Sequence, residues 1–395
     1  MPVNYQQIQK QVREQIKLAP ARKKLFEERL NRARDILTQH AADLDSLRSK
    51  VEHAANADKS LRCAAPLTET LESAHLAEVP SVYPVLLAAD GSQINPNRHD
   101  AVEFGLVNVG VITIKPSQAA VPVETTSSDL YLFTDPEEDS RPLTEELVAL
   151  KRDFKERNVL AELAKSQPGV VLTLTDGPLE LFREPKEDAR FDRLFEQYLD
   201  VMELLASMNA VTAGYVDKPA ADLVVRLLEL TLYPDEELQK AGREHKLGGV
   251  RDIDLFGRLL DPGERSAVFA IQSPTADKFR HRIGGQIAIH FFYLNVGLPG
   301  KPWLVRVELP AWVSSQPDMV DLLQATLMQQ CRQMGARAYP YTLHRAHEIA
   351  LVSFQEKQQL QLMIEAEMRR EGIDYGNQSN KQAAKDLEGR KGYQA

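Results

Sequence analysis

Residues 85–96 read VLLAADGSQINP, an apolar run that stops at an acid, a glycine and a serine. A second run, VVLTLTDGPL at residues 170–179, also stops at Asp-Gly. Continuous apolar runs of this length are typical of strands that are buried on both faces of an α/β sheet. We therefore predict two buried strands, with Asp90 and Asp176 at their ends and a sharp turn at the glycine that follows each acid.

The segments around these two runs alternate between strand and helix patterns. Thr144 is a suitable N-cap for the first helix between them, and Gly105 or Gly110 marks a bulge in the second strand. The alternation predicts an α/β fold, with a sheet flanked by helices. We predict strands at 85–90, 102–114, 131–134, 170–176, 210–217, 266–272, 286–296 and 303–310, and helices at 142–166, 188–208, 220–230, 317–334 and 341–371.

Residues 4–56 are rich in helix-forming residues and contain a single proline, Pro20. Ile8, Val12 and Ile16 recur at four-residue spacing, and the apolar pattern resumes after Pro20. We predict a short helix followed by a long one. These helices form either a coiled-coil-like interaction arm or an amphipathic layer on the body of the protein.

The remaining pattern divides the chain into three parts. Residues 57–84 lack a clear period and are predicted to form a linker with one helical turn. We predict a helical arm with its linker at residues 1–75, a main domain at 76–371, and a polar, disordered tail at 372–395.

The composition is that of a soluble globular protein, because 43% of the 395 residues are hydrophobic and 27% are charged. The formal net charge of −9 argues against broad electrostatic binding of nucleic acid, but it allows local basic patches. No apolar run is long enough to span a membrane, and the N-terminus lacks the apolar segment of a secretory signal. Cys63 and Cys331 lack metal-ligand spacing. These features predict a cytoplasmic protein.

The two acids at strand ends have a chemical and a structural interpretation. If the strands are neighbours, about 4.8 Å apart, both carboxylates face one point, and a divalent cation relieves their repulsion. Such hard oxygen ligands suit Mg²⁺ or Mn²⁺ rather than Zn²⁺. In the alternative interpretation each Asp-Gly is an ordinary turn, because this pair is common in turns.

A third stretch, YPYTLHRAHEIALVS at residues 339–353, favours the chemical interpretation. His344 and His347 are spaced to share one helix face, and Pro340 suits the first turn of that helix. The set AADGSQ, LTDGPL and YPYTLHRAHEIA, in this order, resembles the NurA family of prokaryotic DNA-end-processing nucleases. The resemblance covers about residues 85–355 and includes AGYVDKPAADLVVRLLEL. It implies that the main domain is a NurA-like nuclease domain with an RNase H-like mixed sheet.

The resemblance also implies a set of site residues. Of the two histidines, it selects His347 rather than His344, and it pairs His347 with Tyr339. The sequence departs from the family at the second Asp-Gly, where Pro178 stands in place of a serine. The implied metal ligands are Asp90, Asp176 and a glutamate on the helix before the second acidic strand, for which we choose Glu156, with Asp153 and Glu162 as alternatives.

The implied activity is that of a metal-dependent deoxyribonuclease with 5′–3′ exonuclease and single-strand endonuclease action in DNA end processing and recombinational repair. Two Mn²⁺ or Mg²⁺ ions, roughly 3.5–4 Å apart in sites of this kind, would activate water and neutralise the transition state. His347 would orient water or protonate the leaving oxygen, and Tyr339 would contact a phosphate or stack on a nucleotide.

The resemblance implies three partners: DNA as single strands or duplex ends, a second copy of the chain in a homodimer, and a HerA-type hexameric ATPase. The motor must be a separate protein, because the chain has no GxxxxGK[ST] loop. The N-terminal helices and IAIHFFYLNV at 287–296 are candidate contact surfaces, although an aromatic strand is more often core. Four basic residues are candidate contacts to the DNA backbone, or else ordinary solvated charges: Lys278, Arg280, Arg282 and Arg345.

Two rival functions remain open at this point. The first is a non-catalytic protein with an RNase H-like scaffold that docks to a DNA motor. The second is an acid-rich phosphotransferase or phosphatase on a similar sheet.

Overall fold

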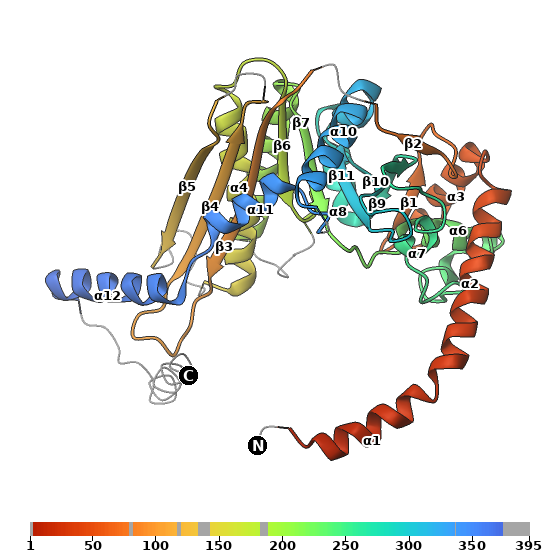
Figure 1. The fold of residues 1–395 in the computed structure, drawn as a ribbon, viewed down its shortest axis with the longest axis horizontal. Coiled ribbons are helices and arrows are strands. Elements are labelled where there is room, and N and C mark those ends of the chain that lie inside the picture. The colour runs from red at the N-terminus through yellow and green to blue at the C-terminus, as the bar shows by residue number, and fades with distance from the viewer. Residues whose placement is uncertain are drawn as a thin grey trace. The chain divides into compact units, whose positions relative to one another are not determined.

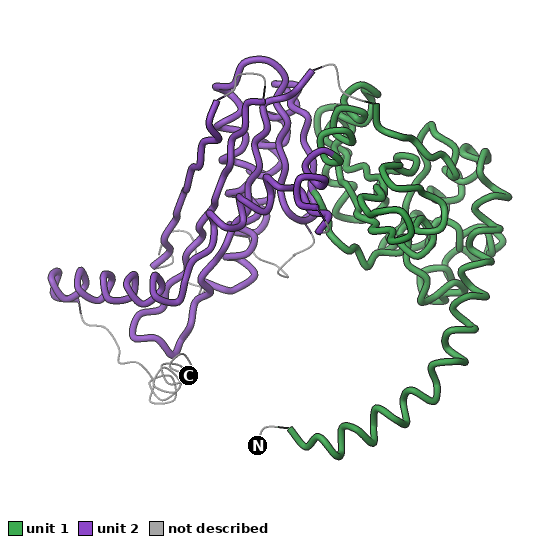
Figure 2. The backbone as a smooth tube through the Cα atoms, viewed as in Figure 1, with its two compact units in different colours: residues 1–79, 215–328 green, residues 80–214, 329–395 purple. Residues whose placement is uncertain are grey.

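The protein is described by a computed structural model that covers residues 3–78, 82–116, 120–132, 143–181, 189–335 and 337–373. The chain falls into two compact units, which Figure 2 shows in different colours. Unit 1 consists of residues 1–79 and 215–328, and unit 2 consists of residues 80–214 and 329–395. Each unit therefore combines two segments that are distant in the sequence.

Unit 2 is built on a mixed sheet with the strand order β5-β4-β3-β6-β7 (Figure 1). β3, β4 and β5 form an antiparallel meander, and β6 then pairs parallel to β3. A parallel pair needs a crossover, which the helix between β5 and β6 supplies. The strands are β3 (Val85–Ile94), β4 (Gly105–Ile114), β5 (Val123–Tyr131), β6 (Val171–Asp176) and β7 (Val211–Val216).

Helices cover both faces of this sheet, as the sequence predicted. Successive strand residues point to opposite faces, so Val85, Leu87 and Ala89 share one face of β3 and pack against α4 (Glu145–Ala164). α5 (Ala189–Ser207) packs against α4, and α11 (Tyr341–Ala350) packs on β3 and β4 from the other face. Thr144 caps α4 as predicted, because its side chain accepts a hydrogen bond from the backbone N–H of Leu147 at 3.2 Å. The predicted mixed α/β sheet flanked by helices is confirmed.

Two predictions about the strands of unit 2 are wrong in detail. The strand predicted at 131–134 lies earlier, as β5, and residues 133–134 fall outside the described part of the chain. The bulge predicted at Gly105 or Gly110 is absent from the unbroken register between β3 and β4. Gly110 instead allows α11 to pack closely on β4, because a Cβ at this position would lie 2.6 Å from the carbonyl oxygen of Ala346 in α11.

The single helix predicted at 341–371 is two helices, α11 and α12 (Phe354–Arg370). A capping box starts the second helix: Ser353 Oγ accepts from Glu356 N at 3.2 Å, and the Glu356 carboxylate accepts from Ser353 N at 2.7 Å. Ile364 and Met368 of α12 are buried against Phe104. The Ser-x-x-Glu spacing is visible in the sequence and would have located this break.

Unit 1 has its own set of antiparallel strands, in the order β1-β9-β10-β11. Two of its strands, β1 (Cys63–Pro66) and β2 (Ala74–Leu76), come from the segment predicted to be a linker. They are too short for a period to show in the sequence. The other strands are β8 (Glu264–Ser266), β9 (Phe269–Gln272), β10 (Ile289–Asn295) and β11 (Leu304–Pro310), with β8 pairing with both β2 and β10.

The N-terminal residues form three helices instead of the predicted two: α1 (Tyr5–Ile16), α2 (Ala19–Gln39) and α3 (Leu44–Ala57). α2 and α3 bury an apolar stripe that includes Leu37 and Val51, and they pack on α6 (Leu223–Leu230). α1 buries none of its residues, and Figure 1 shows it extending away from α3 and α6. Most of the predicted arm therefore belongs to the body of unit 1, and the interaction-arm prediction stays open for α1 alone.

The remaining helices correspond to predicted helices or are short connections. No helix in the described part of the chain is long and apolar enough to cross a membrane. The predicted disordered tail lies mostly outside the described residues, which end at 373. The predicted domain boundaries stay predictions. The remaining helices are α7 (Asp252–Phe256), α8 (Pro274–Arg280), α9 (Ala311–Ser314), α10 (Pro317–Gln333) and the 3-10 turns Asp235–Lys240 and Ile283–Gly285.

Candidate active site

The two acidic strands are neighbours in the sheet of unit 2. Their parallel register runs from Val85 beside Val171 to Ala89 beside Thr175. Asp90 and Asp176 are the next residue on each strand, so they lie side by side where the parallel ladder ends. Neighbouring strands are about 4.8 Å apart, so the two carboxylates lie close together at the end of this pair of strands.

The predicted turn after Asp90 is wrong. β3 continues to Ile94, because β4 goes on pairing with it as far as Leu106. Gly91 is therefore a strand residue, and its missing side chain has another use. A Cβ at Gly91 would lie 2.6 Å from Cγ of Arg152 and 2.7 Å from Oε1 of Glu156. The glycine lets these two α4 side chains lie directly on the strand next to Asp90.

The turn predicted after Asp176 is present, with Gly177 at φ +92°. The carbonyl oxygen of Pro178 accepts a hydrogen bond from Arg157 Nη2 at 2.8 Å, and that of Leu179 accepts from the Tyr198 hydroxyl at 2.8 Å. On the β7 side, a Cβ at Gly214 would lie 2.5 Å from the carbonyl oxygen of Gly177. The loop that carries Asp176 is thus held by α4, α5 and β7.

Glu156 is the most perturbed acid of this region. Its side chain is only 4% exposed, and its Oε2 lies 2.8 Å from Arg157 Nη1. Burial raises the pKa of Glu156 to about 8, and nearby Asp153 and Asp90 add to the effect against the opposing charges of the two arginines. A buried carboxyl with a raised pKa is costly to ionise, and a bound cation next to it would stabilise its charged form.

The alternatives to Glu156 separate clearly in space. Asp153, one helical turn earlier, accepts from Arg152 Nη2 at 2.8 Å and faces the same pocket. Glu162 is exposed, is paired with Lys165 at 2.8 Å and does not line that pocket. The structure therefore keeps Glu156 and Asp153 as helix-borne candidates and gives no support to Glu162.

These acids line one pocket of about 400 Å³ in unit 2. It contains five carboxylates and two guanidinium groups, so negative charge is in excess. Within the described ranges, no three His, Cys, Asp or Glu side chains are already arranged to hold a metal ion. The donor chemistry nevertheless fits a hard divalent cation, because every acidic donor is a carboxylate oxygen. The lining residues are Asp90, Arg152, Asp153, Glu156, Arg157, Asp176, Gly177, Pro178 and Glu180.

His347 of α11 contacts this site through Asp90, although it is not among the residues that line the pocket. Its Nδ1 lies 2.6 Å from Oδ2 of Asp90, while the imidazole remains 55% exposed. The end of α11 is fastened to the sheet, because the Ala350 carbonyl oxygen accepts hydrogen bonds from Ser92 Oγ and from Asn108 Nδ2, the latter at 2.8 Å. The serine of the first Asp-Gly-Ser therefore anchors the helix that carries His347. His344 points to a different partner, Glu348, at 3.6 Å.

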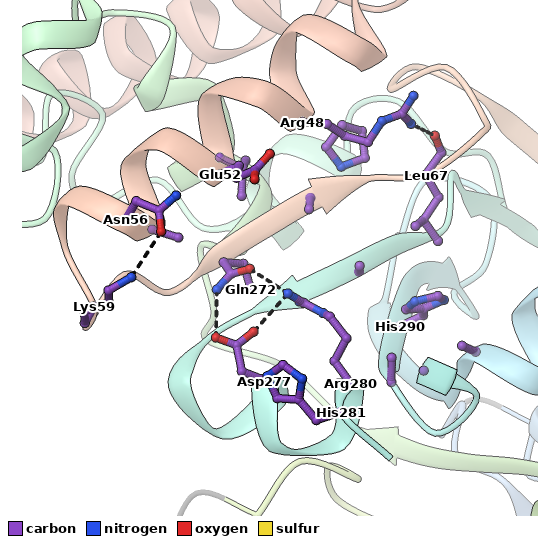
Figure 3. Close-up of a pocket in the computed structure, with 18 of the residues that line it drawn as sticks. Arg48, Glu52, Asn56, Lys59, Leu67, Gln272, Asp277, Arg280, His281 and His290 are labelled. Atoms are coloured by element: carbon purple, nitrogen blue, oxygen red, sulfur yellow. Dashed lines mark hydrogen bonds and ion pairs between the residues drawn. The ribbon is translucent and has the colours of Figure 1, made fainter. Parts of the chain in front are cut away.

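The other sequence candidates do not line the acidic pocket. Tyr339 lies just before α11, and Arg345 forms ion pairs with Glu124 and Glu348. Lys278, Arg280 and Arg282 belong to unit 1, where Arg280 lines a separate pocket of about 670 Å³ and contacts Gln272 and Asp277 (Figure 3). Their roles as contacts to DNA stay predictions.

Sequence reasoning missed Arg152, Arg157 and Glu180 as pocket residues. Arg152 precedes Glu156 by four residues, a spacing that places both on one helix face. Glu180 is 1% exposed and follows Asp176 by four residues in the loop. The only signal in the sequence is an acid close behind an acidic strand end.

A sequence profile described as the NurA domain matches residues 84–352, which is more than half of the chain. The chain belongs to the NurA family. This membership confirms the resemblance and supports a nuclease. The mixed sheet flanked by helices is the fold expected from the sequence.

Solved structures are similar at low sequence identity. The NurA nuclease from Sulfolobus solfataricus is 11% identical with a TM-score of 0.48, over 85% of this NurA-family chain and 97% of that one. The catalytic domain of human endonuclease V is 13% identical with a TM-score of 0.30, over 84% and 99%. LC9-RNase H1 is 12% identical with a TM-score of 0.22, over 52% and 84%. No curated protein sequence matches the chain.

Proposed function

We propose that this NurA-family protein is a divalent-metal-dependent deoxyribonuclease whose active site is the acidic pocket of unit 2. The observation that carries the proposal is the meeting of Asp90 and Asp176 at the end of the β3–β6 ladder, with Glu156 on one side and His347 on the other. Asp90, Asp176 and Glu156 or Asp153 would hold the metal, for which we propose Mn²⁺ or Mg²⁺ and two ions. When bound, the ions would activate water and neutralise the charge that develops on the phosphate.

The chain's own residues supply the orientation and proton transfer. Asp90 holds the Nδ1 side of His347, which leaves Nε2 directed away from that contact. An imidazole nitrogen can accept or donate a proton, so Nε2 is suited to take a proton from water or give one to the leaving oxygen. The anchoring of α11 by Ser92 and Asn108 keeps this ring in place. Tyr339 is the proposed contact to a phosphate or nucleotide.

The finer features of the proposal come from the family resemblance. They are 5′–3′ exonuclease and single-strand endonuclease action on DNA, a role in end processing and repair in the cytoplasm, a homodimer, and docking to a HerA-type ATPase. The buried thiols Cys63 and Cys331 form no disulfide, which supports a reducing compartment. The exposed stripe Ile8, Val12 and Ile16 of α1 supports an interaction surface at the N-terminus.

The decisive test is cleavage of DNA labelled at either end, with Mn²⁺, Mg²⁺ or EDTA. Single strands, blunt duplexes and circular single strands separate exonuclease from endonuclease action and show its polarity. We expect metal-dependent cleavage that EDTA abolishes. Folded protein that leaves all three substrates intact would instead support the non-catalytic scaffold, and hydrolysis of p-nitrophenyl phosphate without DNA cleavage would support a phosphatase.

Two truncations test the role of the N-terminal helices. Deleting residues 1–17 removes α1, which buries nothing, so unit 1 should stay folded while dimerisation or binding of the motor weakens. Deleting residues 1–56 should give insoluble protein, because it removes the buried stripes of α2 and α3 from the core. Light scattering measures the dimer. Unchanged dimerisation and motor binding without α1 would remove that helix from the proposed interface.

A further inference from the structure

The two arginines of the acidic pocket are held in different ways. Arg157 is 3% exposed and donates to the backbone carbonyl oxygens of Asp153 and Pro178, at 3.2 and 2.8 Å, as well as to Glu156. It also lies over the ring of Tyr198, 5.9 Å from the centroid. These contacts connect α4 to the loop after β6, so Arg157 is a fixed part of the scaffold.

Arg152 is bound through its charge partners. Its side chain is 27% exposed, and its guanidinium lies 2.8 Å from Oδ1 of Asp153 and 3.5 Å from Oε1 of Glu156. Burial lowers the pKa of Arg152, but Asp153, Glu156 and Asp90 outweigh it and raise the pKa overall. Its stem lies over Gly91, where a Cβ would come within 2.6 Å of Cγ. The stem is therefore confined, while the head group is held by carboxylates that face the pocket.

We propose that Arg152 is the counter-ion of the acidic pocket in the metal-free protein and contacts the DNA phosphate once a metal is bound. The inference rests on the proposed nuclease function. A divalent cation and the guanidinium compete for the same carboxylate oxygens of Asp153 and Glu156. When the cation takes these oxygens, the partly exposed head group loses its partners and is repelled by the ion. The substrate then supplies a new anion, and a guanidinium matches a phosphate with two parallel hydrogen bonds.

This arrangement gives Arg152 two opposite effects. Without DNA it opposes metal binding, because the cation must displace it. With DNA it favours cleavage, because it binds charge on the reacting phosphate. A purely structural ion pair on α4 would have neither effect, and removal of a metal ligand would weaken both metal binding and cleavage.

The test compares the wild type with Arg152→Gln, Arg152→Lys and the control Lys165→Gln. Lys165 is a cation at the far end of the same helix, with Glu162 as its partner at 2.8 Å. Mn²⁺ binding is measured without DNA from the electron paramagnetic resonance of free Mn²⁺, and cleavage is measured at saturating Mn²⁺. For Arg152→Gln we expect the Kd for Mn²⁺ to fall about fivefold or more. We expect its kcat to fall about 10²-fold.

Arg152→Lys keeps the positive charge but loses the two-pronged geometry. It should bind Mn²⁺ as the wild type does and still cleave more slowly. It also carries the test if Arg152→Gln does not fold, which melting in EDTA would show. Lys165→Gln should match the wild type in both measurements.

Two results would overturn the inference about Arg152. Unchanged or weaker Mn²⁺ binding by folded Arg152→Gln, or wild-type Mn²⁺ binding with wild-type cleavage by Arg152→Lys, would each do so. A wild type that neither binds Mn²⁺ nor cleaves DNA is a different result, because it would overturn the proposed function and the inference together.

Discussion

The same dipeptide has different structures at the two strands that meet in the pocket. Asp90-Gly91 lies inside a strand, where glycine gives room to Arg152 and Glu156. Asp176-Gly177 ends a strand, where glycine adopts φ +92° and turns the chain. The pairing partners explain the contrast. β3 has an antiparallel neighbour that continues to Leu106, whereas β6 reaches its end beside Ala89 and Asp90.

Because the two strands differ, charged side chains from several elements meet where the β3–β6 ladder ends. The continuing strand offers Asp90 to α11 on one face and Gly91 to α4 on the other. The ending strand offers Asp176 as its last residue, and α4, α5 and β7 hold the loop that follows. A turn at both positions would leave β3 too short to pair Ser92 with Asn108, the two side chains that fasten α11.

The largest expected effect is that of Asp90→Asn. It should reduce Mn²⁺-dependent cleavage to the level seen in EDTA, because it removes the charge that we propose to hold the metal and changes the partner of His347. Without metal the variant should be at least as stable as the wild type, since repulsion with Asp176 and Glu156 is relieved. Mn²⁺ should raise the melting temperature of the wild type much more than that of the variant.

Asp176→Asn is the matched variant on the other strand and should show the same pattern. A structural aspartate would behave in the opposite way. Its replacement would cost roughly 1 kcal/mol of stability and leave cleavage intact. A variant of Asp90 that melts earlier and still cuts DNA would therefore show that this position is not a metal site.

The two glycines offer a more direct test of the comparison. Gly91→Ala places a Cβ against Arg152 Cγ and Glu156 Oε1, so it should displace these side chains and reduce cleavage more than stability. Gly177→Ala meets nothing within 4 Å, but its φ of +92° is unfavourable for alanine and should cost about 1–2 kcal/mol. Cleavage at a temperature where both proteins are folded, combined with urea unfolding, separates the two effects. Equal losses of activity and stability at both positions would contradict the comparison.

Sequence reasoning found most of the strands of unit 2, because buried strands and periodic helices leave strong patterns. It left open whether the two acidic strands are neighbours, which the structure shows. It failed where one local pattern fits two structures. Asp-Gly fits a turn, and it also fits a strand on which a helix packs closely over the glycine. At Asp90-Gly91 the strand forms, because β4 continues to pair with β3 beyond this point. The helix break at Ser353 was readable from its capping box, but β1 and β2 are too short to show a period.

The position of charges within the pocket was harder to predict than their presence. Glu156 was chosen from the family pattern, and the structure places it with Asp90 and Asp176. The involvement of Arg152 depends on Gly91, which is 61 residues earlier in the chain and beside it only after β3 and α4 pack. Contacts of this kind follow from tertiary packing and leave no local signal.

A smaller effect is expected from Ser92→Ala. The substitution removes one of the two donors to the Ala350 carbonyl oxygen and leaves Asn108 in place, so it should cost about 1 kcal/mol. Looser seating of α11 should lower kcat with little change in KM, because the role proposed for His347 is on the reacting groups. Ser166→Ala is the matched control, since its hydroxyl also donates to a helix carbonyl, that of Leu163, on the exposed end of α4. Equal kcat values for the two variants would show that Ser92 does not help to position His347.

The smallest effect is expected at Pro178, which occupies the position of Ser92 in the second Asp-Gly. The structure uses the carbonyl oxygen of Pro178, which accepts from Arg157 at 2.8 Å, and a serine would keep that oxygen. Pro178→Ser should therefore leave Mn²⁺ binding and cleavage unchanged. It should lower stability by only about 0.4–1 kcal/mol, because serine gives the unfolded chain more freedom than proline does. A clear rise in metal affinity or kcat would mean that a hydroxyl at this turn acts on the metal or substrate. The residues after the two Asp-Gly pairs would then have similar functions, although their backbones differ.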